Sequence, residues 1–323
     1  MNIRSLIGEV LAATDLHPIL FDIGASGESH AIWDPICEHA IFVGFDPDER
    51  ELQEVANGKF FRNVIINKAV TDEYDAETVK FYLTQSPFCS SMLPPNHAIL
   101  SEYLFADLFT VKHETSVPAT TLTAALEAVQ LSHIDWLKLD TQGIDLRLLK
   151  SLNEALFSQL LAVDIEPGLT EFYLGESQFT DLHPYLLSQG FWLSDMVVKG
   201  SVKMRKQSLE SYEPSISEQD ALQRRMKSAP GWVEARYLRN LDYITTPEQH
   251  ILLWVFALLD HQIGFAVDVT FQYGELFGKN HHYIQMLDTI RSMQQALPKQ
   301  QMMDKIRSLL PVSFKKRVKS ILR

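Results

Sequence analysis

Short apolar runs alternate with helix-like segments over the first two-thirds of the chain, and this alternation limits the fold more than any other feature. Such runs are apolar nearly throughout when they form parallel strands with helices packed on both faces. Six runs of this kind lie at residues 19–23, 40–45, 63–70, 135–139, 160–165 and 191–196. They predict a doubly wound, mostly parallel α/β sheet. Two further stretches, 78–84 and 108–117, alternate apolar and polar residues, which is typical of edge strands or a hairpin.

The pattern changes after residue 207. Residues 208–220 are polar, contain Pro214 and lack periodicity, as a linker does. Residues 221–323 show helical spacing of apolar residues instead. We therefore expect one domain over 1–207, a linker over 208–220, and a helical C-terminal extension over 221–323.

The aromatic residues of this extension are expected to pack in its core, because they occur among helically spaced apolar residues. They are Trp232, Tyr237, Tyr243 and Trp254. An apolar helical layer is also compatible with an interface to a second copy of the chain.

Composition narrows the class of protein. The chain has 323 residues, of which 46% are hydrophobic, so it can bury a large core and is not a disordered protein. Two cysteines and no cluster of zinc type point to the reducing cytoplasm. The longest apolar run, 251–259, is far shorter than the roughly 20 residues that cross a bilayer.

Charge is spread unevenly along the chain. The formal net charge is −12, yet residues 304–323 carry seven basic residues and one acidic residue. The acidic body should repel nucleic acid. Residues 312–323 form a basic amphipathic pattern, which favours either peripheral contact with an anionic membrane at its inner face or packing against the acidic body.

A glycine turn follows the first apolar run, in the stretch FDIGASGESH at residues 21–30. Asp22 lies near the end of the run, Gly24 and Gly27 form the turn, and residues 29–39 have helical character. Asp46 ends the next run, at a spacing close to that of a ribose-binding carboxylate in nucleotide-binding units. The loop taken alone is equally compatible with an ordinary turn beside solvated strand ends.

The charges around this turn indicate which nucleotide it would hold. Asp22, Glu28 and Asp46 would surround a bound pyrophosphate with carboxylates, which is unfavourable for NAD. S-adenosylmethionine carries an ammonium and a sulfonium, and both gain from the same carboxylates. The pattern therefore favours S-adenosylmethionine.

Several motifs occur in one order along residues 18–207: FDIGASGE, VGFDPDERELQEV, VIINKAVTD, VPATTLTAAL, IDWLKLDTQGIDLRLLK and VDIEPGLTEFYLGESQFTDLHPYLLSQGFWLSDM. In this order they resemble the FkbM-type methyltransferases. The resemblance implies a class I Rossmann-like fold and S-adenosylmethionine-dependent methylation of a hydroxyl. It also implies a small-molecule or glycan acceptor, such as a saccharide or a secondary-metabolite precursor.

The resemblance also implies roles for single residues. Around the methionine part of the cofactor it places Asp22, Gly24, Ala25 and Gly27. It places Asp46 at the ribose, and Asn67 and Ser91 near the adenosine. Asp140 matches the acidic residue of the family segment I-D-x-x-K-I-D-x-E-G.

The chain departs from the family pattern at three positions. Gln142 stands where the family has Glu, Asp145 where it has a second Glu, and Thr123 where it has Asp. These changes keep open a catalytically inactive binding platform that uses the same fold. An NAD-dependent oxidoreductase is a further alternative, which the acidic turn opposes.

Methyl transfer to oxygen needs positioning and removal of the acceptor's proton. Asp140 follows a central run, at the sheet edge where ligands bind in open α/β folds. Asp164 and Glu166 alternate along the next run, so that one or both can face the same crevice. Asp140 and Glu166 are therefore the candidate catalytic residues, either binding the acceptor hydroxyl directly or sharing a divalent cation that acidifies it.

Overall fold

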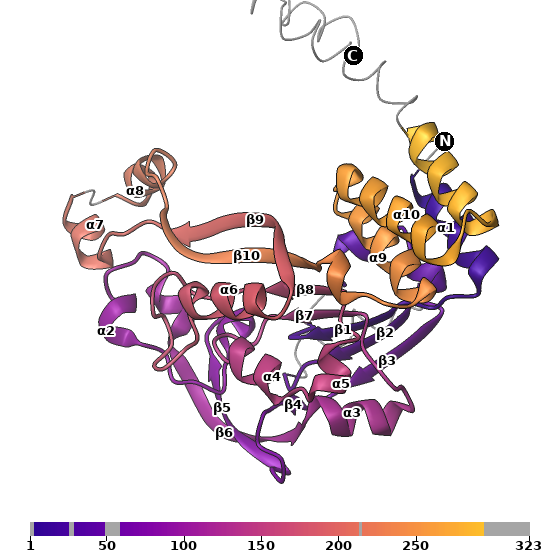
Figure 1. The fold of residues 1–323 in the computed structure, drawn as a ribbon. Coiled ribbons are helices and arrows are strands. Elements are labelled where there is room, and N and C mark those ends of the chain that lie inside the picture. Colours follow the sequence, from indigo (N-terminus) through magenta and orange to yellow (C-terminus); the bar gives the residue numbers. More distant parts are fainter. Residues whose placement is uncertain (1–2, 26–28, 49–58, 213–214, 294–323) are drawn as a thin grey trace, which may run out of the picture.

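A seven-stranded sheet with the order β3-β2-β1-β7-β8-β10-β9 forms the centre of the molecule (Figure 1). This computed structural model describes residues 3–25, 29–48, 59–212 and 215–293. The strands of the sheet are β1 (Ile19–Ile23), β2 (Ile41–Phe45), β3 (Arg62–Ile66), β7 (Trp136–Leu139), β8 (Ala162–Ile165), β9 (Phe191–Ser201) and β10 (Ala229–Arg239). The first five of these are parallel, and β10 is antiparallel to both of its neighbours. The predicted doubly wound, mostly parallel sheet is confirmed.

Helices cover both faces of this sheet. Successive side chains alternate between the faces, so that Leu20 and Trp136 pack on one side while Phe21 and Leu137 pack on the other. The first face is covered by α1 (Ile3–Thr14), α9 (Pro247–Leu259) and α10 (Ile263–Phe277). The second is covered by α3 (Leu122–Val129), α4 (Asp145–Ser151), α5 (Glu154–Phe157) and α6 (Phe179–Ser188). A further helical segment begins at residue 281 and continues to the last described residue.

A small second sheet lies beside the main one, with the order β4-β6-β5. Its strands are β4 (Ala69–Val70), β5 (Thr78–Thr84) and β6 (Val111–Thr120). β5 and β6 are antiparallel, which confirms the pairing expected for their alternating patterns. The run predicted at 63–70 is divided between β3 in the main sheet and β4 in the small one. The short helix α2 (His97–Leu100) follows β5.

The expectation of a helical unit over 221–323 is wrong for residues 229–239. These residues form β10, which pairs with β8 on one side and β9 on the other. The strand was missed because Glu234 and Arg236 interrupt its apolar residues, although the burial of Val233 and Ala235 shows period-two alternation. Residues expected as an aperiodic linker contain α7 (Lys206–Tyr212) and α8 (Ile216–Gln223).

The segment after β1 also differs from the expectation of a helix over 29–39. It contains two 3-10 turns, η1 (Ala31–Trp33) and η2 (Cys37–His39), in place of an α-helix. Pro35 lies between them and lacks the N–H that a continuous helix would need there. The described part of this segment therefore offers no long helix whose dipole could attract a phosphate.

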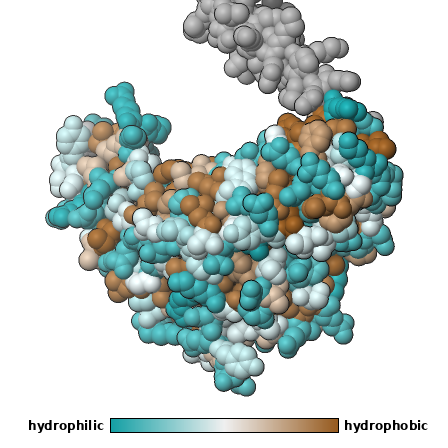
Figure 2. Space-filling view, viewed as in Figure 1, coloured by the Kyte–Doolittle hydropathy of each residue, from teal (hydrophilic) through white to brown (hydrophobic). Residues whose placement is uncertain are grey.

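β9 is an edge strand, and it exposes the apolar residues Met196, Val197 and Val198. Apolar side chains gather in the hollow between the α7–α8 region and the C-terminal helices, where β9 and β10 run (Figures 1 and 2). An open apolar edge of this kind can pair with another chain. A homo-oligomer stays a prediction. None of the helices within the described ranges has the length and apolar character that a membrane crossing needs, and the basic tail at 312–323 lies outside those ranges.

Charged side chains alternate in register across one face of the sheet. Asp22 in β1 is aligned with Lys138 in β7, Lys138 with Asp164 in β8, and Asp164 with Arg236 in β10. The guanidinium of Arg236 donates to both carboxylate oxygens of Asp164, at 2.8 and 3.1 Å, and to Asp260 at 2.8 Å. Because Asp260 caps the C-terminus of α9, this buried triad fastens that helix to the sheet.

We predict that Arg236→Met lowers the free energy of unfolding by about 3–5 kcal/mol, because it leaves two buried carboxylates without their cation. Lys199→Met is the matched control, since Lys199 in β9 pairs with Glu234 in β10 but both side chains are more than 40% exposed. That variant should lose at most about 1 kcal/mol. Urea unfolding of both variants measures the difference, and equal losses would contradict a special role for the triad.

Candidate active site

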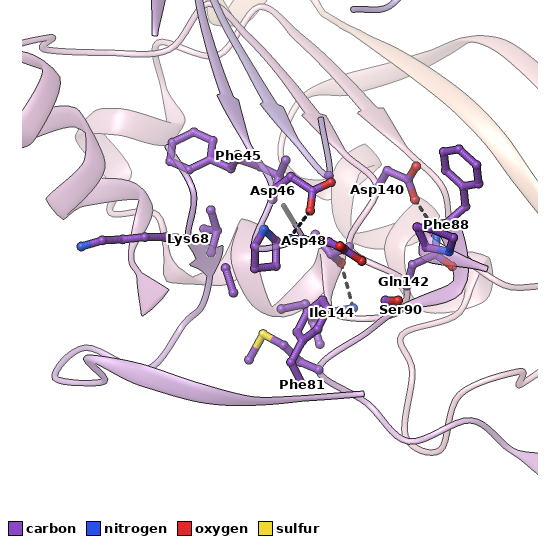
Figure 3. A pocket seen from close by; sticks show the side chains of 18 residues that line it. Phe45, Asp46, Asp48, Lys68, Phe81, Phe88, Ser90, Asp140, Gln142 and Ile144 are labelled. Carbon is purple, nitrogen blue, oxygen red and sulfur yellow. Dashed lines mark hydrogen bonds between the residues drawn. The ribbon is translucent and has the colours of Figure 1, made fainter. Parts of the chain in front are cut away.

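A crevice opens at the carboxyl ends of β1, β2 and β7 (Figure 3). This is the edge at which open α/β sheets bind ligands. Gly24, Asp46 and Asp140 follow the three strands and line the crevice. Its other walls are largely apolar and come from both sheets and from the segment that connects β5 to α2. Among them are Phe45, Val70, Phe81, Phe88, Met92 and Ile144.

Gly24 brings the ends of β1 and β7 into contact. Its φ of +89° is in the region that side chains disfavour, and an added Cβ would lie 2.3 Å from the carbonyl oxygen of Asp140. The N–H groups of Gly24 and Ala25 both donate to the carbonyl of Phe45 at 2.9 Å, which ties the turn to β2. Gly27 lies outside the described residues. The part of the glycine turn that is described thus places its backbone directly beside Asp140.

Asp46 directly follows the end of β2 and is buried. Its Oδ1 accepts a hydrogen bond of 2.7 Å from the backbone N–H of Asp48. Burial raises the pKa of Asp46 to about 6, and the neighbouring carboxylates of Asp48 and Asp140 act in the same direction. The carboxylate points into the crevice (Figure 3) and, at neutral pH, is free to accept from a ligand's hydroxyls.

The two residues expected near an adenosine are placed differently from each other. Asn67 is exposed and is not among the residues that line the crevice, whereas its neighbour Lys68 is. Ser91 is buried, and its hydroxyl donates to the carbonyl of Gln142 at 2.8 Å. Ser90 lines the crevice in its place. This loop therefore borders the crevice through Ser90 and not through Ser91, and its place near an adenosine stays a prediction.

A series of hydrogen bonds between side chains, which begins at Tyr173, holds Asp140 in place. The Tyr173 hydroxyl lies 2.9 Å from Oε1 of Gln142, and Nε2 of Gln142 donates to Oδ1 of Asp140 at 2.5 Å. A carboxylate oxygen only accepts, so Asp140 fixes the amide with its nitrogen toward Oδ1. The Tyr173 hydroxyl also lies 2.9 Å from the carbonyl oxygen of Cys89, and its single proton can go to either oxygen. Gln142 has a φ of 55°, which turns the chain back after β7. Among the described residues, no hydrogen-bond donor lies within bonding distance of Oδ2 of Asp140, so this oxygen is available to a ligand.

Asp145 replaces the longer Glu of the family pattern and joins the ends of β7 and β8. One of its oxygens accepts from the hydroxyl and the N–H of Thr141, and the other accepts from the N–H of Glu166 at 3.2 Å. Burial raises its pKa to about 6. Because it is almost fully buried and fully engaged, Asp145 positions the neighbouring loops and does not face the crevice.

Lys138 is the site residue that sequence reasoning missed. Its ammonium lies 3.2 Å from Oδ1 of Asp22, and 3.9 Å from both Oδ2 of Asp140 and Oε1 of Glu166. Burial opposes its charge, but these three carboxylates outweigh burial and raise its pKa above the usual range of lysine. A lysine inside the apolar run DWLKL was the available signal, because a buried central strand rarely holds an unpaired charge.

Glu166 follows β8 and faces Asp140, as expected, whereas Asp164 is occupied by Arg236. Burial raises the pKa of Glu166 to about 9, and the nearby carboxylate of Asp140 adds to this shift. Burial likewise raises the pKa of Asp140, against the opposing effects of Lys138 and Gln142. The pKa values of both carboxyl groups are thus raised, and the pair can hold a proton between them at neutral pH.

A second cleft lies on the other side of Asp140 and Gln142, which with Phe88 line both spaces. Its wall is aromatic and includes Phe88, Phe105, Phe109, Phe172, Tyr173 and Trp232. Its lining also carries four carboxyl groups, which we term its carboxyl floor, from Asp140, Glu166, Glu176 and Glu234. The expectation that Trp232 packs in a helical core is wrong, because it lies parallel to Phe105 in this cleft, at 6.3 Å between ring centroids. Tyr237 and Trp254 are buried as expected, while Tyr243 is half exposed.

The sheet has one antiparallel strand inserted between β8 and β9, and the crevice lies beside β1, β2 and β7. Together these two features define a Rossmann-like fold of the methyltransferase class. The chain matches the Methyltransferase FkbM domain over residues 29–193, just over half of its length, and it belongs to that family.

Other comparisons add little. Among solved structures, a chain described as "StiE O-MT residues 961-1257" is similar at 11% identity and a TM-score of 0.30, with 80% of each chain covered. Likeness at this level supports no conclusion about the site. A search of curated proteins found no match. Within the described ranges, no group of three or more His, Cys, Asp or Glu side chains is arranged to hold a metal ion.

The raised pKa of Glu166 predicts how stability depends on pH. The folded protein keeps a proton that the unfolded chain releases near pH 4.5, so the free energy of unfolding falls as pH rises toward about 9. Between pH 7.5 and 9, the wild type should lose about 1–2 kcal/mol more than Glu166→Gln, which has no proton to lose. Urea unfolding at both pH values measures this difference.

Glu176→Gln is the matched control for this experiment. Glu176 lines the same cleft, and burial raises its pKa only to about 7. Its replacement should flatten the stability profile below pH 7 and leave the interval from 7.5 to 9 as in the wild type. If Glu166→Gln and the wild type lose stability in parallel over that interval, Glu166 does not hold a proton in the folded protein at these pH values.

Proposed function

We propose that this protein is an S-adenosylmethionine-dependent O-methyltransferase that acts on a hydroxyl of a saccharide or of a related glycan or secondary-metabolite precursor. The observation that carries the proposal is the meeting of two clefts at Asp140 and Gln142. One cleft has the position and charge for a cationic nucleoside, and the other can hold an acceptor. The cysteine content favours the cytoplasm as the place of this reaction.

The residues of the first crevice fit S-adenosylmethionine better than a dinucleotide. Asp46 can accept from both ribose hydroxyls, and Phe81, Met92 and Ile144 offer apolar surface for an adenine ring. The carboxylates of Asp46, Asp48 and Asp140 would repel a pyrophosphate, but they favour a cationic amino-acid portion. When bound, this cofactor supplies an electrophilic methyl group on a sulfonium.

Asp140 is the group best placed to take the acceptor's proton. Gln142 occupies its Oδ1, and Oδ2 is the oxygen that faces Lys138 and Glu166. In this proposal Glu166 keeps the proton of the pair and donates a hydrogen bond to the acceptor, while Asp140 acts as the base. The two candidate carboxyl groups thus receive different roles in the proposal.

The second cleft supports an uncharged, hydroxyl-rich acceptor. Flat aromatic side chains such as Trp232 and Phe105 can pack against the apolar face of a ring, while carboxyl groups on the floor bind hydroxyls. No lysine, arginine or histidine lines this cleft among the described residues. A phosphorylated acceptor would find no counter-charge there.

Titration calorimetry tests the cofactor, and Asp46 provides its internal check. Because burial raises the pKa of Asp46 to about 6, we expect the Kd for S-adenosylmethionine to weaken about tenfold between pH 7 and pH 5 as this carboxylate takes up a proton. Asp46→Asn should bind more weakly at pH 7 and lose most of that pH dependence. A variant that keeps the full dependence would place the responsible group elsewhere.

The same titrations separate the alternatives. Binding of NAD without binding of S-adenosylmethionine or S-adenosylhomocysteine would overturn the proposal in favour of an oxidoreductase. Cofactor binding without turnover on a panel of neutral saccharides would favour the alternative of a catalytically inactive binding platform. Gln142, which replaces the family's Glu, is the departure that suggests this alternative.

Asp140→Asn tests the catalytic base. Loss of a general base typically lowers turnover 10²- to 10⁴-fold, so we expect S-adenosylhomocysteine release on a responsive saccharide to fall by at least about 100-fold. The Kd for S-adenosylmethionine should change by only a few fold, because the oxygen of the introduced amide can still accept from Gln142. Glu176→Gln, on the same floor, is the control expected to keep more turnover. Full turnover by Asp140→Asn would show that another group removes the proton.

A further inference from the structure

Lys138 is surrounded by carboxyl groups on three elements. In the sheet it is aligned with Asp22 on one side and Asp164 on the other. Its ammonium contacts Asp22 at 3.2 Å and lies at equal distances of 3.9 Å from the facing oxygens of Asp140 and Glu166. Its side chain is only 12% exposed. A charge this enclosed is costly unless its partners compensate it, and here the partners come from β1, β7 and the end of β8.

This position is the one that a bridging metal ion would need. A divalent cation shared by Asp140 and Glu166 would bind between their oxygens, where hard cations accept carboxylate ligands. The Lys138 ammonium already lies 3.9 Å from an oxygen of each of these two groups. A second cation there would meet strong repulsion at short range.

We propose that the Lys138 ammonium is the resident cation of this active site and takes the place of a divalent metal ion between Asp140 and Glu166. The inference rests on the proposed function, because it assigns Lys138 a part in methyl transfer. When the hydroxyl proton of the acceptor passes to Oδ2 of Asp140, negative charge grows on the acceptor oxygen. The ammonium offsets this charge, as a metal ion would in a metal-dependent transferase.

Manganese binding gives a test that needs no acceptor. Lys138→Ala leaves Asp22, Asp140 and Glu166 without their cation and with space between them. We expect this variant to bind one Mn²⁺ per chain with a Kd below about 1 mM, since oxygen ligands suit this ion, whereas the full-length wild type binds none at 1 mM. Loss of the free Mn²⁺ signal in electron paramagnetic resonance measures the binding.

Two controls make the result specific. Lys138→Arg keeps the charge and should bind no Mn²⁺. Lys80→Ala removes an exposed lysine that is paired with Glu114, and it should also bind none. Adding Asp140→Asn to Lys138→Ala should weaken the acquired Mn²⁺ binding at least tenfold.

Lys138→Gln serves if Lys138→Ala does not fold. Its shorter side chain leaves room for an ion and adds an amide oxygen as a ligand, so 1 mM Mn²⁺ should raise its Tm but not that of the wild type. One Mn²⁺ bound by the wild type at this site, or none bound by a folded Lys138 variant that has lost the charge, overturns the inference. Either result leaves the cofactor titrations unaffected, so failure of this inference and failure of the proposed function are distinguishable.

Discussion

The row of alternating charges across the sheet is the interaction on which the arrangement of this site depends. Asp22, Lys138, Asp164 and Arg236 come from four adjacent strands and are aligned in register. A shift of one residue in any strand would turn its charge into the opposite apolar layer, which is a strong penalty. The row therefore fixes the register of these four strands, and with it the positions at which Asp140 and Glu166 follow β7 and β8. One end of the row lies at the candidate active site, and the other, through Arg236, holds α9.

Asp140 lies where two differently built spaces meet. The backbone of Gly24 approaches it from one side, and the amide of Gln142 holds it from the other. The crevice beyond Gly24 is acidic and apolar, whereas the cleft beyond Gln142 is aromatic with a carboxyl floor. Replacing the family's Glu by Gln142 removes a negative charge beside Asp140 and supplies a donor instead. This departure is thus compatible with an active site, because it provides a neutral partner whose amide N–H donates to Asp140.

The sheet, its strands and the crevice edge could be predicted because they depend on local apolar patterns and on the carboxyl ends of parallel strands. Asp46, Asp140 and Glu166 were located at that edge for the same reason. Lys138 and Trp232 could not be assigned, because their roles depend on contacts between segments far apart in the chain. β10 was missed since the charged residues Glu234 and Arg236 alternate with its apolar ones, and their charges are satisfied by Lys199 and Asp164 only in the assembled sheet. Pairing across the sheet, and not local preference, decides these elements.

The position of β10 has a consequence for how the protein is made. β8 and β9 are consecutive in the sequence but do not pair, because the strand between them is supplied by residues 229–239. Until those residues leave the ribosome, β8 has an open apolar edge and β9 has no partner in the main sheet. The segment that matches the family model, 29–193, is therefore not a unit that can close its own sheet. A nascent chain halted before residue 229 would expose two strand edges, the kind of surface that other chains join.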